Sequence, residues 1–178
     1  IEGGNILLDE AKNEYNKYSD LLESNKKRKK KKGEKKTLSG KKYVQSATYN
    51  FSKGYKVLFL LYENKIQTYS FKQNKQKIDK ILEDANSKYN EGIEQLNIIN
   101  TYSEKELSKT VKFVDIIAVT EKALYDLNSS IDLLIYAVTL YKEQNNKPKD
   151  IITDENKYWI DVQKTNTVTS YTNYLNKY

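Results

Sequence analysis

The chain has 178 residues, a length that suits a single domain with a sizeable core. It contains no Cys and no His, which excludes a disulfide framework and removes the commonest general base and metal ligand of enzymes. The net charge of +7 is unevenly distributed, because the segment 26–42 carries +10 and the remainder −3. We therefore expect a non-enzymatic protein, without metal or cofactor, that has one strongly basic segment.

Apolar residues recur three and four positions apart along most of the chain, a spacing typical of one face of a helix. In chain order, this pattern predicts helices over about 5–24, 43–69 and 78–99, with a bend around 70–74. The spacing of Ser103 and Glu106 is that of a capping box, so a further helix is predicted to begin at 103.

The helix that begins at 103 would run for about 38 residues unless it breaks near Asp126–Ser129, and the turn residues before Pro148 end it. A weaker helix is expected over about 153–178, where β-branched residues are frequent. Together these elements predict an all-α fold, an elongated up-down bundle of four or five helices with a long basic loop between the first two. We expect a single domain over 1–178, with 25–42 as a flexible Lys-rich loop.

The basic segment is the main candidate for function. A block of like charges stays solvated and attracts polyanions, although a solvated loop without a partner has the same composition. Because the chain has one Arg, the segment suits neutralisation of sulfate, phosphate or carboxylate groups better than base-specific recognition. The predicted polyanion-binding residues are Lys26, Lys27, Arg28, Lys29, Lys30, Lys31, Lys32, Lys35, Lys36, Lys41 and Lys42.

Most of the sixteen Tyr residues lie on the apolar stripes, where a core ring with its hydroxyl at the edge is expected. Four Tyr residues lie elsewhere, in a connection or on several faces of the last segment, and are the predicted partner-binding aromatics: Tyr102, Tyr171, Tyr174 and Tyr178. The glycines of Gly33–Lys42 suggest a phosphate-binding loop. However, six residues separate them where four are needed, and Lys42 stands where Ser or Thr should be, so we reject that interpretation.

The Lys/Asn/Ile/Tyr-rich composition, the amphipathic helices and the segment Ala85–Leu96 resemble the helical outer-surface lipoproteins of Lyme-disease and relapsing-fever spirochaetes. Locally, Tyr49-Asn50, Tyr62-Glu63 and Lys77–Ile81 are similar to the helical domain of their fibronectin-binding, complement-inhibiting members. The resemblance implies a lipid-anchored protein outside the cell membrane, whose lipidated Cys would precede Ile1. A surface or exported helical protein of an AT-rich apicomplexan parasite would share this composition.

We therefore expect a surface binding protein, an adhesin or immune-evasion factor that captures a host extracellular or serum protein or a glycosaminoglycan. The basic loop would supply electrostatic capture, and aromatic residues on the bundle surface would supply specificity. The alternative is an intracellular helical protein that binds nucleic acid.

Overall fold

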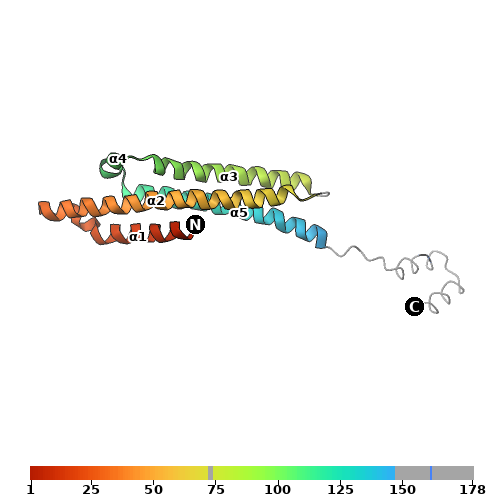
Figure 1. The fold of residues 1–178 in the computed structure, drawn as a ribbon, viewed down its shortest axis with the longest axis horizontal. Helices are drawn as coiled ribbons and strands as arrows, with labels where there is room; N and C mark the ends of the chain where they lie inside the picture. Colours follow the sequence, from red (N-terminus) through yellow and green to blue (C-terminus); the bar gives the residue numbers. More distant parts are fainter. Residues whose placement is uncertain (72–73, 147–160, 162–178) are drawn as a thin grey trace, which may run out of the picture. The chain divides into compact units, whose positions relative to one another are not determined.

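The computed structural model describes residues 1–71, 74–146 and 161, and within them it contains α-helices and one 3₁₀-helix but no strand (Figure 1). The chain divides into two compact units, Ile1–Thr139 and Leu140–Tyr178. Most of the second unit, including the helix predicted over about 153–178, lies outside the described residues, so the single-domain prediction stays a prediction.

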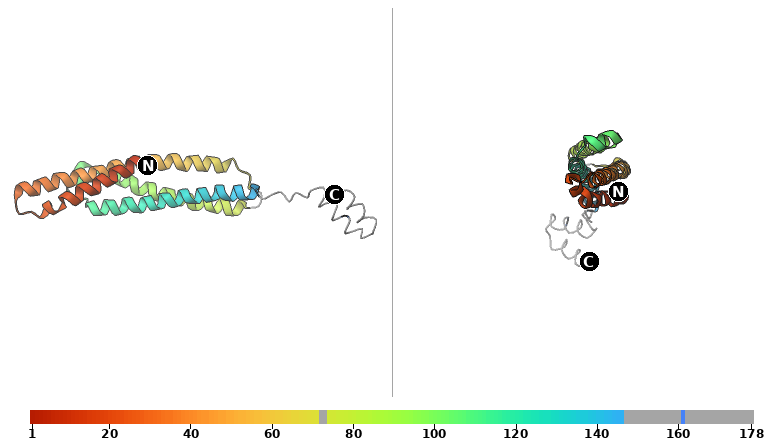
Figure 2. Two further views of the ribbon diagram at one scale, coloured as in Figure 1. Left: turned by 90° about the horizontal axis from the view of Figure 1, so that it is seen from below. Right: turned by 90° about the vertical axis from the view of Figure 1, so that its left-hand side faces the viewer.

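Consecutive long helices of the first unit reverse direction, so its topology is up-and-down (Figures 1 and 2). Helix α1 (Glu2–Tyr18) lies antiparallel to α2 (Lys27–Gln67), α3 (Lys75–Thr101) returns along α2, and α5 (Phe113–Asn146) again runs in the direction of α2. At about 1.5 Å per residue, α2 alone is roughly 60 Å long. The predicted all-α bundle is confirmed.

The basic loop predicted over 25–42 is wrong, because nearly all of it is the first part of α2. Only Ser24, Asn25 and Lys26 separate α2 from the short 3₁₀-helix η1 (Ser19–Glu23) that follows α1. The physical reason is a row of small buried residues, Gly33, Thr37 and Gly40, which continues the apolar stripe of Val44, Ala47 and Phe51 toward the N-terminus of α2. Successive residues of this combined stripe are three or four positions apart, and all of them are buried.

The small residues of this stripe let α1 and η1 approach the backbone of α2 closely. A Cβ atom at Gly33 would lie 2.9 Å from the Cβ of Leu21, and one at Gly40 would lie 3.2 Å from the carbonyl oxygen of Ala11. Most of the basic side chains occupy the other faces of the same turns, where they remain in water, whereas Lys36 and Lys41 are half-buried. Packing on one face therefore holds a helix that charge repulsion alone would oppose.

The bend predicted around 70–74 is confirmed to the extent that α2 ends at Gln67 and α3 begins at Lys75. Helices α3 and α5 then approach closely at Gly92, where a Cβ atom would lie 2.6 Å from the Cγ of Leu127 and 2.9 Å from the carbonyl oxygen of Ala123. Near this crossing the hydroxyl of Ser130 donates a hydrogen bond of 2.7 Å to the carbonyl oxygen of Ala85.

The predicted capping box is confirmed at the start of α4 (Glu104–Lys109), where the Ser103 hydroxyl accepts from the Glu106 amide and the Glu106 carboxylate accepts from the Ser103 amide. Of the two alternatives for the helix predicted to begin at 103, a break near Asp126–Ser129 does not occur, because α5 is continuous there, and the chain breaks instead between Lys109 and Phe113. Leu107 and Phe113 are both buried but six positions apart, a spacing that one straight helix cannot place on one face.

Replacing Ser103 with Ala is expected to lower the melting temperature at pH 7, because the first turn of α4 loses its side-chain cap. The hydrogen bonds from Ser103 lower the pKa of Glu106. A lowered folded-state pKa stabilises the fold above the unfolded-state value, and this contribution is lost as the pH falls through the folded-state pKa. The difference in melting temperature between the original chain and the Ser103 variant should therefore shrink as the pH is lowered from 5 to 3. An equal difference at both pH values would show that Glu106 takes no part in the cap.

Candidate polyanion-binding site

The N-terminal part of α2 brings the basic residues together on one helix. Lys26 is the N-cap residue, its side chain makes no capping hydrogen bond, and the first turn of α2 contains no acid. The first backbone amides of a helix lack intrahelical partners and carry the positive end of its dipole. The basic side chains therefore add positive charge to the N-terminal end of α2, where the helix dipole already favours an anion.

Three of the eleven predicted residues are partly engaged in holding the fold. Lys36 lies 3.5 Å from the Glu14 carboxylate, and Lys42 lies 3.0 Å from that of Glu104. The ammonium of Lys41 donates a hydrogen bond of 2.8 Å to the carbonyl oxygen of Leu107, and burial lowers the pKa of Lys41. These lysines connect α2 to α1 and α4, so their ammonium groups are less available to a ligand.

The other eight residues are exposed and form no ion pair with any described residue: Lys26, Lys27, Arg28, Lys29, Lys30, Lys31, Lys32 and Lys35. Lys32 and Lys36 lie 5.5 and 5.3 Å from the ring centroid of Tyr18, which places both cations near one aromatic face. Sequence reasoning could not separate the eight solvated cations from the three that hold the fold, because the separation depends on contacts with α1 and α4.

Five of the eight line a shallow hollow of about 650 Å³: Arg28, Lys29, Lys31, Lys32 and Lys35. Residues three, four and seven positions apart project from the same side of a helix, so these five side chains lie on neighbouring positions of one helix surface. Their long aliphatic stems form the walls, while the charged ends reach water. We call these five residues the basic hollow.

Of the predicted partner-binding aromatics, only Tyr102 lies within the described residues; Tyr171, Tyr174 and Tyr178 lie outside them. Tyr102 is half-buried, and its carbonyl oxygen accepts a hydrogen bond of 2.9 Å from Gln45. Its ring lines a cavity between α3 and α5 that no pattern in the sequence predicts. Of the other rings, Tyr55 is buried and Tyr15, Tyr18, Tyr62 and Tyr89 are half-buried, as expected, whereas Tyr49, Tyr125 and Tyr136 are exposed. Tyr15 stacks on Phe113 with 4.2 Å between ring centroids.

Gly33 and Gly40 lie inside α2 and face η1 and α1, so the rejected phosphate-binding loop does not form there. Among the described residues, no three His, Cys, Asp or Glu side chains gather as metal ligands would. None of the helices in the described part of the chain is long and apolar enough to cross a membrane.

Comparison with known proteins adds no relative: no protein family, curated protein or solved structure matches the chain. Functional inference consequently depends on the chemistry of the described residues.

Proposed function

We propose that the protein is a non-enzymatic binding protein that captures a sulfated glycosaminoglycan, or an equally anionic surface, through the basic end of α2. The observation that carries this proposal is the basic hollow, which five cations without an acidic partner line near the N-terminal end of a helix. A helical scaffold fixes the spacing of these cations, so less side-chain and backbone freedom is lost on binding than from a flexible loop.

Sulfated polysaccharide suits this site better than nucleic acid. Lys ammonium groups are compact point charges that neutralise anions without a preferred geometry, whereas base and bidentate phosphate recognition depends largely on Arg. The eight solvated cations include one Arg and seven Lys. A position at the cell surface, an upstream lipid tether and a host partner belong to the same proposal, and a signal peptide followed by Cys in the upstream gene would support them.

A variant in which Arg28, Lys29, Lys31, Lys32 and Lys35 are replaced with Gln tests the proposal. Heparin retention should fall sharply, because the variant loses all five charges of the basic hollow. The melting temperature should stay constant or rise slightly, because the replaced charges are solvated and lie near the positive pole of α2. Heparin-column elution and thermal unfolding measure the two effects.

A matched control removes the same net charge elsewhere, through Gln at five exposed lysines: Lys56, Lys65, Lys75, Lys80 and Lys105. This control should retain most of its heparin affinity. Equal losses in the two variants would show that net charge alone governs binding, and full retention by the first variant would show that the basic hollow has no part in it.

A further inference from the structure

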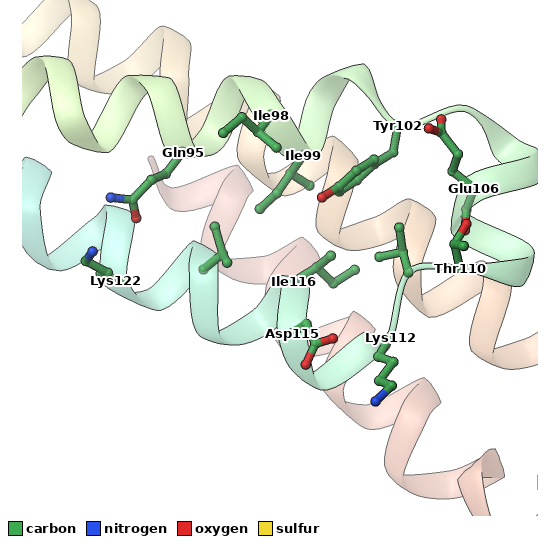
Figure 3. A pocket seen from close by; sticks show the side chains of 12 residues that line it. Gln95, Ile98, Ile99, Tyr102, Glu106, Thr110, Lys112, Asp115, Ile116 and Lys122 are labelled. Atoms are coloured by element: carbon green, nitrogen blue, oxygen red, sulfur yellow. The ribbon is translucent and has the colours of Figure 1, made fainter.

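A cavity of about 690 Å³ opens between the last turns of α3 and the first turns of α5 (Figure 3). It lies beyond the close approach of the two helices at Gly92, and Glu106 of α4 and the connection Thr110–Lys112 complete its lining. Helix α4 packs on α2, where Lys41 binds the carbonyl oxygen of Leu107 and Lys42 pairs with Glu104. The volume lies within the range of typical ligand pockets.

The walls of the cavity are largely aliphatic. Ile99 and Ile116 are buried and form the deeper part, whereas Ile98 and Val119 remain 49% and 37% exposed. Figure 3 shows Ile98 and Ile99 on α3 facing Ile116 on α5. Exposed apolar surface in a concave site gains free energy when a ligand removes it from water. The walls therefore favour an occupant with a branched aliphatic group.

One end of the cavity carries an amide. Gln95 of α3 lies opposite Lys122 of α5 (Figure 3), and the Oε1 atom of Gln95 is shielded from solvent and accepts no hydrogen bond. A buried acceptor without a partner costs free energy that a ligand donor would recover. The last torsion of a Gln side chain is soft, so a small rotation presents its amide to the cavity. A carboxamide offers one acceptor and two donors, which matches the groups of a peptide bond.

The charges at the rim have both signs. Lys112, Asp115 and Lys122 are exposed and form no ion pair with a described residue, whereas the Glu106 carboxylate already accepts hydrogen bonds from Ser103. A fatty-acid carboxylate would meet a lysine but would offer no donor to Gln95. A neutral peptide group satisfies the acceptor and tolerates the mixed rim, so it is the better chemical match.

We infer that this cavity binds a short peptide segment, which inserts one branched aliphatic side chain between α3 and α5 and hydrogen-bonds its backbone to Gln95. Tyr102, whose ring lines the cavity near the end of α3, would cover the inserted side chain (Figure 3). The site is separate from the basic hollow in both position and chemistry, and its occupant need not be anionic.

Titration of the methyl-labelled full chain with N-acetyl-leucine-N-methylamide tests the inference by NMR. The methyl signals of Ile98, Ile99 and Ile116 should shift with one saturable curve, while those of Ile78 and Ile81, which lie elsewhere on α3, should not move. The glycine analogue of the probe lacks the aliphatic group and should cause no saturable shift. Absence of saturable shifts with the leucine probe would overturn the inference.

Two variants and one control make the test specific. Replacing Gln95 with Leu keeps the side-chain size but removes the amide, and should weaken binding of the leucine probe roughly three- to tenfold. Replacing the half-exposed Ile98 with Asp should abolish the shifts, whereas the same change at Val57, which is 67% exposed on α2, should have no effect. If the Ile98 variant fails to fold, the affinity of the Gln95 variant for the leucine probe still tests the inference. Decanoate that binds as well as the leucine probe, with no effect of the Gln95 replacement, would overturn the assignment to a peptide.

Discussion

The affinity of the full chain for heparin is expected to fall by about a thousandfold when the salt concentration rises from 50 to 200 mM, if six or more cations engage the polyanion. Each neutralised anionic group releases condensed counterions, and added salt reduces the entropy gained from that release. Eight exposed cations without an acidic partner lie on Lys26–Lys35, so engagement of six is sterically reasonable. Surface plasmon resonance or fluorescence anisotropy at four salt concentrations gives the slope of log affinity against log salt concentration.

The variant that lacks the charges of the basic hollow provides the control for this slope. With five of the eight cations replaced, the dependence of log affinity on log salt should become much shallower, while the variant with five lysines replaced elsewhere should keep the steep slope. A single-stranded oligonucleotide, titrated in parallel, tests the alternative of nucleic-acid binding. Tighter binding of the oligonucleotide than of heparin at equal salt would favour that alternative.

Helix content was predictable from the sequence, but the structure of the basic segment was not. The stripe that begins at Val44 predicts a helix because its members are apolar, whereas its continuation through Gly40, Thr37 and Gly33 consists of small residues that hydrophobicity does not detect. Those residues are informative only once α1 and η1 are known to pack on them, because a glycine in an isolated helix is destabilising. A three-four spacing of small residues was the available signal.

The break before α5 could not be predicted for a related reason. Leu107, Val111 and Val114 have helical spacing, which predicts one continuous helix, yet Val114 is 54% exposed and the buried residue is Phe113. The stacking of Phe113 on Tyr15 of α1 determines which side of α5 faces the core. This contact joins residues that are 98 positions apart in the sequence. The cavity between α3 and α5 likewise depends on where two distant helices cross. Single-sequence periodicity contains no such information.

Replacing Gly92 with Val is expected to lower the free energy of unfolding by about 3 kcal/mol, the upper part of the range for overpacked cores. The added Cβ would lie 2.9 Å from the carbonyl oxygen of Ala123, a backbone atom of α5 that cannot rotate away, and 2.6 Å from the Cγ of Leu127. Relief requires α3 and α5 to separate, which would also stretch the hydrogen bond from Ser130 to Ala85. Urea unfolding followed by circular dichroism measures the change.

Gly3 offers a contrasting position, because it too lies in a helix but has space around it. A Cβ atom at Gly3 would meet only the Asn50 side chain, at an ordinary contact distance of 3.7 Å. Replacing Gly3 with Ala should therefore raise the free energy of unfolding by about 0.5 kcal/mol, since it reduces the freedom of the unfolded chain without a clash. Changes of opposite sign in the free energy of unfolding for the two substitutions would show that the steric constraint lies at the crossing of α3 and α5. A Gly92 variant as stable as the original chain would show that the helices do not approach closely there.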